Sequence, residues 1–427
     1  MEILQYIDSD DARDLCCTSQ AFMSALQAKV YDNLIFQEDA SSAGRVLAIA
    51  SGPRARLVHT IVYSPRDPKP KKGWEDEDES EHDPSIALSD EADEVLRSLK
   101  RFPGLEKFRF VLDEWVLENW PGMPTSFSFE WDEHHDDEET EPWRILLAQS
   151  FDALVDSAGA FSSLELENLP PVPTEEPYDI FYTEVWQELL GGLKSFEITL
   201  SDYPDEGAGS ITTAHQKFLS QLPQMFLNHL TEAEHLGIKG QEWAFIGHYG
   251  NFPIVWGRLR LPRLKSFALE YSALDKSLGS FLVRHSGLAL EKIYLRRCLG
   301  EAMEDWERLC QKLAEKNPPQ LVEFTVVPYP VRKRLLFETW DDWNAANWEM
   351  WTKLDAAGEM ERDILDEKNA MFVVGETCES YGRIQPSPKW VEDEEDSHLY
   401  DESHIVEEWK KIASNVEKNK IHLGLSS

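Results

Sequence analysis

Leu193-Lys-Ser-Phe196-Glu-Ile198 and Leu264-Lys-Ser-Phe267-Ala-Leu269 are two copies of the short pattern that decides the fold of this 427-residue chain. Each copy has a leucine, two mostly polar residues, an apolar residue, and then alternating polar and apolar residues. Alternation with a period of two predicts a strand that buries one of its faces. Five further copies begin at Leu105, Phe161, Ala233, Leu290 and Leu321. A divergent copy covers residues 58–63.

A helical segment precedes most of these strand copies. In residues 303–314 the apolar side chains Trp306, Leu309, Cys310 and Leu313 recur at helical spacing, and Pro318-Pro319 ends the segment before the next strand. The other expected helices cover residues 90–102, 143–155, 182–190, 216–230 with an interruption near Pro223, and 278–285.

A unit of helix, tight turn and strand cannot bury its apolar face alone, but stacked units can. The sequence therefore predicts an α/β fold in which residues 37–330 form a curved solenoid, with a parallel sheet inside and helices outside. This region resembles an irregular leucine-rich-repeat array, and Leu164-Glu-Leu166-Glu-Asn168-Leu169 comes nearest to that consensus. The alternative is a doubly wound α/β domain, which the same alternation of elements permits.

The first 36 residues form a separate pattern of three very short helices around one apolar seam. The inward residues are Ile3, Leu4 and Ile7 in the first helix, Ala12, Leu15 and Cys16 in the second, and Phe22, Ala25, Leu26 and Val30 in the third. Residues 8–11, Asp-Ser-Asp-Asp, interrupt the periodicity and favour a turn and a helix cap. Leu34-Ile-Phe36 then predicts the start of a strand.

These segments resemble the F-box of filamentous-fungal proteins, which docks a substrate receptor on a cullin–RING ubiquitin ligase. The matching stretches are Glu2-Ile3-Leu4, residues 6–12 and Leu15-Cys-Cys-Thr-Ser-Gln-Ala-Phe22. The resemblance implies that residues 1–36 are an F-box-like module. It also implies that the residues that pack the module and contact the adaptor subunit are Ile3, Leu4, Ile7, Leu15, Cys16 and Phe22.

Two features depart from the family pattern. The motif usually opens with Leu-Pro directly before Glu-Ile-Leu, and this chain starts at the residues that follow, so we expect an N-terminally truncated module. Ala12 stands where the family has leucine. Exchanging leucine for alanine at a packed position costs about 2–5 kcal/mol.

The chain is strongly acidic, with 42 Lys and Arg against 79 Asp and Glu and a formal charge of −37. This charge argues against nucleic acid and against an anionic membrane surface as partners, and it predicts a basic protein partner. Three acidic runs contribute to it, at residues 75–79, 132–139 and 392–396, and we expect the first two to be insertions between repeats.

The five cysteines are scattered and lack CxxC spacing, which is typical of a reducing compartment, cytoplasmic or nuclear. Met1 is followed by Glu2 and no basic stretch, so no signal peptide is predicted, and no apolar run is long enough to span a membrane. A long helical pattern over residues 332–366 holds four tryptophans, and an acidic tail and a final amphipathic helix over residues 405–416 follow it. We expect residues 331–427 to form a C-terminal helical cap.

No motif in the chain indicates chemistry. HExxH, EF-hand and paired-cysteine zinc spacings are missing, and so are the GxSxG elbow and a complete glycine-rich phosphate loop. His134-His135 lies in a run of carboxylates that lacks the fixed geometry of a metal site. The sequence therefore predicts no metal, no cofactor and no catalytic residue.

The predicted function is that of a non-catalytic substrate receptor. The F-box-like module would bind the adaptor subunit of a cullin–RING ligase, and the polar strand positions would hold a client protein for ubiquitination. The expected client-facing residues are Lys107, Arg109, Glu165, Glu197, Lys239, Glu270, Tyr294 and Arg296. The alternatives are a stand-alone repeat scaffold that does not dock on a ligase, and an enzyme built on an α/β fold.

Overall fold

The computed structural model describes residues 18–65, 88–112, 142–171, 180–201, 213–241, 246–247, 254–286, 289–300, 303–327 and 403–425. These residues form a mixed α/β fold around a sheet of nine parallel strands. The strands are β1 (Asn33–Phe36), β2 (Thr60–Tyr63), β3 (Lys107–Val111), β4 (Ser163–Leu169), β5 (Ser195–Leu200), β6 (His235–Lys239), β7 (Ser266–Glu270), β9 (Lys292–Arg296) and β11 (Glu323–Val327). Two-residue strands β8 (Ala273–Leu274) and β10 (Leu299–Gly300) pair with each other beside this sheet.

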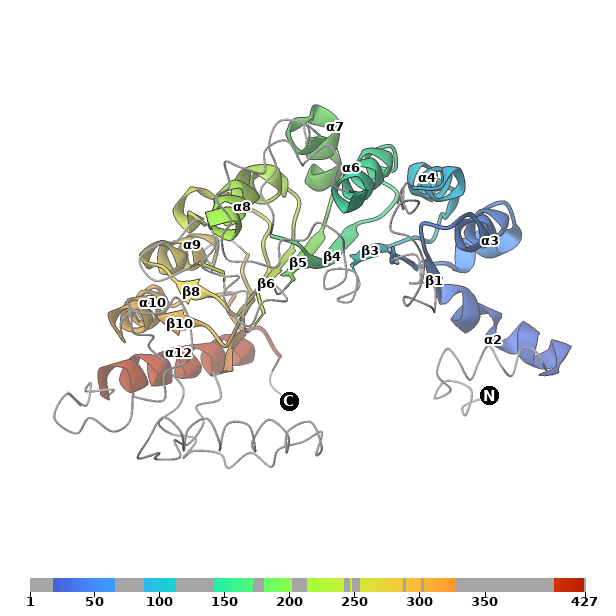
Figure 1. Ribbon diagram of the computed structural model, residues 1–427. Helices are drawn as coiled ribbons and strands as arrows, with labels where there is room; N and C mark the ends of the chain where they lie inside the picture. The colour runs from blue at the N-terminus through green and yellow to red at the C-terminus, as the bar shows by residue number, and fades with distance from the viewer. Residues whose placement is uncertain are drawn as a thin grey trace, which may run out of the picture.

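Helices cover one side of the sheet. Figure 1 shows them along the outer side of an arc whose inner side is formed by the strands. They are α3 (Ala40–Ala50), α4 (Asp90–Arg97), α6 (Pro142–Val155), α7 (Glu184–Gly191), α8 (Thr213–Met225), α9 (Lys276–Ser286) and α10 (Met303–Lys316). At the two ends of the arc, α2 (Gln20–Asp32) leads directly into β1, and α12 (Ser403–His422) packs on α10.

The strand order follows the chain order from β1 to β11 without a reversal. A doubly wound sheet reverses its strand order at a switch point, so the described strands do not have that topology. The same backbone contact recurs at each step from β2 to β11. The carbonyl of His59 accepts from the N–H groups of both Glu106 and Lys107, and the carbonyl of Glu291 accepts in the same way from Val322 and Glu323.

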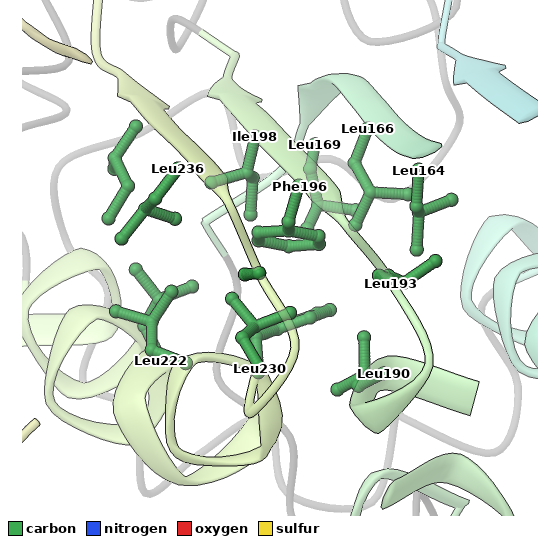
Figure 2. Close-up of a cluster of buried hydrophobic side chains, with 14 of the residues drawn as sticks. Leu164, Leu166, Leu169, Leu190, Leu193, Phe196, Ile198, Leu222, Leu230 and Leu236 are labelled. Carbon is green, nitrogen blue, oxygen red and sulfur yellow. The ribbon is translucent and has the colours of Figure 1, made fainter. Parts of the chain in front are cut away.

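The strand alternation buries one residue in two against the helices. One buried row crosses the sheet as Leu34, Ile61, Phe108, Leu164, Phe196, Leu236, Phe267 and Ile293. Figure 2 shows how Leu164, Phe196 and Leu236 of three neighbouring strands point toward Leu190, Leu222 and Leu230 of the helical side. Because each unit supplies leucine and phenylalanine to the next, one continuous core connects the units.

Aromatic rings reinforce the N-terminal half of this core. Phe36 stacks on Tyr63 with ring centroids 4.9 Å apart, and Tyr63 contacts Phe110 at 5.2 Å. The series continues through Phe151 of α6 to Trp186 of α7, whose indole N–H donates to the carbonyl of Met225 at 2.8 Å. Such ring pairs stabilise a core by about 0.5–1.5 kcal/mol each beyond the area that they bury.

Most predicted helices are present, with corrected bounds. The helix expected over residues 90–102 ends at Arg97 and continues as a 3-10 turn, because the buried Ser157 hydroxyl donates to Leu96 O and accepts from Leu99 N–H. The interruption expected near Pro223 is present, because α8 ends at Met225 and a 3-10 turn over Leu227–His229 follows it. Helix α12 is longer than the predicted 405–416.

Several predicted features lie outside the described residues. These include the three acidic runs, the tryptophan-rich pattern between residues 331 and 402, and Ile3, Leu4, Ile7, Leu15 and Cys16 of the N-terminal module. Residues 33–36, which the sequence places at the end of that module, form the first strand of the sheet, and Leu34 and Phe36 belong to the common core.

Candidate protein-interaction face of the sheet

The strand residues that point away from the helices form what we call the inner face. All eight residues predicted to face a client lie on it: Lys107, Arg109, Glu165, Glu197, Lys239, Glu270, Tyr294 and Arg296. Each is partly exposed and alternates with buried core residues along its strand. The register aligns Arg109 with Glu165 and Glu197 in one row, and Lys239 with Glu270 and Arg296 in another.

Ion pairs join these residues into three groups. In the first group, on β3 and β4, Lys107 pairs with Glu165, and Arg109 pairs with Glu167. Arg109 Nε also lies 3.3 Å from Glu165 Oε2, although the N–H is not aimed for a hydrogen bond. The side chain of Glu165 is 13% exposed, so its burial, together with the adjacent Glu167 carboxyl, raises the pKa of Glu165.

The second group lies on β5 and β6 and has one carboxylate with two partners. Glu197 accepts from Lys239 Nζ at 2.9 Å and contacts His235 Nε2 at 3.1 Å. The hydrogen bond with His235, followed by that with Lys239, lowers the pKa of Glu197 to about 2 against the opposing effect of burial. Gly237 makes room for this arrangement, since a Cβ there would lie 3.0 Å from Glu197 Cγ.

The third group lies on β7, β9 and β11. Arg296 donates to Glu270 at 3.2 Å, Lys292 lies 3.4 Å from Glu323, and the ring of Tyr294 stands beside them in the row of Ala268. Glu167, His235, Gly237 and Lys292 also belong to the face, although they were not among the predicted residues. They alternate with apolar residues along their strands, and this pattern in the sequence could have identified them.

The arrangement suits exchange of polar contacts better than stability. An ion pair between exposed side chains, such as Lys292 and Glu323, contributes about 0–1 kcal/mol, because solvent screens it and ordered side chains lose entropy. The same side chains can bond to charged and polar groups of a bound polypeptide at little cost, since one ion pair replaces another. Ten or more ionisable and polar side chains along one sheet face therefore form a surface that is able to bind protein by charge pattern.

Of the predicted adaptor-contact residues, the structure describes Phe22 alone. It lies on α2 with 38% of its surface exposed, while Leu26 on the same helix is 3% exposed. The other five lie outside the described residues.

The described residues contain no group of three or more His, Cys, Asp or Glu side chains placed to hold a metal ion. Within the same ranges, no helix combines the length and apolarity needed to cross a membrane. Cys298 and Cys310 are buried, and desolvation raises the pKa of each thiol to about 12, which is typical of cysteines that pack as small hydrophobic residues.

Comparison with known proteins gives no family for the chain. No model of a known protein family matches it. A search of curated proteins also finds no match.

Proposed function

We propose that this protein is a non-catalytic client receptor of a cullin–RING ubiquitin ligase. The F-box-like N-terminus would bind the adaptor subunit, and the inner face of the sheet would bind the client. The observation that carries the proposal is the inner face itself, where all eight residues expected to contact a client share one partly exposed surface. The F-box role is supported by the sequence resemblance of residues 1–36.

We also propose that the sheet and its helices are an irregular leucine-rich-repeat-like solenoid. Three observations support this: the strands follow the chain order, the helices cover one side, and at each step from β2 to β11 one carbonyl accepts two successive N–H groups. In such a fold every unit contributes one strand to a common inner face. A client would therefore contact residues that are far apart in the sequence.

In this proposal the ligase's other subunits perform the chemistry. The receptor contributes proximity, which converts an encounter in solution into a reaction between bound partners. The main alternative is a stand-alone repeat scaffold, which uses the same inner face and does not bind the adaptor.

The test is a pull-down of the purified full chain with the F-box adaptor of the source organism. Removing residues 1–36 would also remove β1, whose Leu34 and Phe36 are buried. The better variant is therefore the triple substitution Ile3→Ser, Leu4→Ser and Ile7→Ser in the full chain. Its matched control is Ile421→Ser, because Ile421 is 66% exposed on α12 at the other end of the molecule.

We expect the wild-type chain and Ile421→Ser to bind the adaptor and the triple variant to lose binding. Absence of binding by the wild-type chain, with its thermal unfolding intact, would reject docking and favour the scaffold.

A further inference from the structure

Tyr271 and Arg297 occupy the same place in two neighbouring units. Each directly follows its strand, β7 or β9, at the point where the chain turns toward β8 or β10. Their N–H groups bond to the next strand, Tyr271 to Arg296 O at 3.0 Å and Arg297 to Val327 O at 2.7 Å. Both backbones are left-handed, with φ of 48° and 51°.

Large side chains are uncommon in this conformation, which favours glycine or asparagine. Asn168 illustrates the usual solution at the equivalent place in β4. Its φ is 56°, and its side-chain N–H₂ donates to Leu112 O at 3.0 Å. Tyr271 and Arg297 contact each other, and the guanidinium of Arg297 lies 5.1 Å from the centre of the Tyr271 ring. The turn alone does not require these two residue types.

Arg297 also differs from the arginines of the inner face in its partners. Arg109 pairs with two carboxylates and Arg296 with one. Across the described ranges, the guanidinium of Arg297 has no hydrogen bond or ion pair, and its one recorded contact is with the ring. An arginine stacked on an aromatic ring keeps its N–H edge available, and that edge matches the two oxygens of a carboxylate.

The charges around it are complementary to an acidic ligand. The inner face from β3 to β5 carries Lys107 and Arg109 against Glu165, Glu167 and Glu197. From β6 to β11, where His235 also lies, it carries Lys239, Lys292 and Arg296 against Glu270 and Glu323, and Arg297 follows directly after β9. The positive charge thus increases toward the Tyr271–Arg297 pair.

The acidic character of the whole chain does not extend to the described surface. The described residues contain 29 Lys and Arg against 28 Asp and Glu, which gives +1, so the other residues carry −38 of the total −37. The expectation of a basic client rests on the whole-chain charge. It therefore remains a prediction for the acidic segments and does not apply to the inner face.

We propose that the Tyr271–Arg297 pair is an anchor for an acidic segment of the client, with a glutamate or aspartate carboxylate bound by Arg297 and neighbouring carboxylates facing Arg296 and Lys292. This inference rests on the proposed client-binding role of the inner face. It predicts that the part of the face at the carboxyl ends of β7 and β9 binds negatively charged sequence of the client.

The experiment compares the full-length wild-type chain with Arg297→Asn. Asparagine tolerates the left-handed backbone, so we expect the variant to unfold at the same temperature as the wild type or slightly above it. In the first experiment, each protein selects peptides from a random library displayed on phage. In the second, fluorescence anisotropy measures the binding of each protein to a fluorescein-labelled peptide of alternating glutamate and glycine. The matched control is Arg263→Asn, which removes the same charge from an exposed position just before β7, at the opposite end of that strand from Tyr271.

We expect the wild type and Arg263→Asn to enrich peptides rich in aspartate and glutamate. We expect Arg297→Asn to lose this enrichment and to bind the labelled peptide about tenfold more weakly, as for the loss of a charged hydrogen-bonded pair. Equal selection by wild type and Arg297→Asn, selection of lysine-rich peptides, or no selection by the wild type would each overturn the proposal.

A second variant separates this inference from the proposed function. Ala268 lies on the inner face between Gly237 and Tyr294, so Ala268→Trp obstructs the face without changing its charge. If Ala268→Trp abolishes peptide selection while Arg297→Asn leaves it unchanged, the face binds clients and the acidic anchor is wrong. If neither variant alters selection, the inner face is not the client surface.

Discussion

Glu165 and Glu197 are directly paired across strands β4 and β5, yet folding shifts the pKa values of their carboxyl groups in opposite directions. Burial raises the pKa of Glu165, and the neighbouring carboxyl group of Glu167 raises it further. Glu197 has His235 and Lys239 as neighbours, and its pKa falls to about 2.

The difference shows that one polar face can hold a group whose carboxylates are incompletely paired beside a group whose carboxylate is fully paired. In the Glu165 group, two carboxylates divide Lys107 and Arg109 between them, and Arg109 Nε and Glu165 Oε2 stay buried without an aligned hydrogen bond. In the Glu197 group, one carboxylate lies over Gly237 and reaches both partners. We therefore expect the first group to depend on its cations for stability and the second on its carboxylate.

The largest effect is expected from Arg109→Met. Removing this guanidinium leaves Glu165 and Glu167 adjacent, with Lys107 as the remaining cation of the group. Loss of one partner from a buried ion pair costs about 3–5 kcal/mol, and partial exposure reduces this to about 3 kcal/mol. Urea unfolding at pH 7 measures the loss. A cost below about 1 kcal/mol would show that solvent already screens the repulsion between the two carboxylates.

The side of the sheet on which these charges lie could be predicted from the sequence. In Leu193-Lys-Ser-Phe196-Glu-Ile198 the alternation places Phe196 and Ile198 in the core and Glu197 opposite, and β5 has that pattern. Apolar periodicity also predicted the helices between the strands. It missed α3, because Ala40–Ala50 is rich in alanine, serine and glycine and shows a weak apolar stripe, and it missed β8 and β10, which have two residues each.

The pairing of the charges could not be predicted. Glu197 meets His235 and Lys239, which lie 38 and 42 positions further along the chain. Which residues align depends on the length of the helix and turns between the strands, and a strand pattern does not contain that information. The role of Gly237 could not be predicted for the same reason. A glycine in a strand makes room for a side chain of a neighbouring strand, and the sequence does not show which side chain that is.

The second prediction concerns the pH dependence of Glu197→Gln. The folded-state pKa of Glu197 is about 2, against an ordinary value of 4.5, so its carboxylate stabilises the fold above pH 4.5, and this contribution is lost as the pH falls toward 2. We expect the variant to lose about 2 kcal/mol at pH 7, as for hydrogen bonds to a charged group. Unfolding of both proteins between pH 7 and pH 2 should show this difference disappearing.

The same substitution at Glu165 provides the contrast. The pKa of Glu165 is raised, so folding disfavours its charged form, and protonation relieves this penalty as the pH falls. We expect Glu165→Gln to cost less than Glu197→Gln at pH 7. Equal costs at pH 7 would mean that the two groups do not differ in the way described.

A smaller effect is expected from Glu167→Gln, which removes the second carboxylate of the Glu165 group. The variant loses the ion pair with Arg109 but also loses the repulsion toward Glu165. The two changes oppose each other, so the free energy of unfolding should change by less than about 1 kcal/mol. The informative measurement is the pKa of Glu165 by carbon-13 NMR of its carboxyl group, which should fall. An unchanged pKa would assign the shift to burial alone.

The smallest change in stability, and the sharpest test of the comparison, is expected from Gly237→Ala. The new Cβ lies 3.0 Å from Glu197 Cγ and 3.4 Å from its carboxyl carbon, so the Glu197 side chain has to move away from His235 and Lys239. Weaker hydrogen bonds destabilise the variant. Alanine in a strand, however, stabilises the folded state by about 0.5–1 kcal/mol relative to glycine, because a chain with alanine loses less conformational entropy on folding. We expect these terms nearly to cancel, with the pKa of Glu197 rising above about 2 by roughly half a unit, because one pKa unit corresponds to about 1.4 kcal/mol. If carbon-13 NMR finds that pKa unchanged, the low value follows from charge alone and the space above Gly237 is not what separates the two groups.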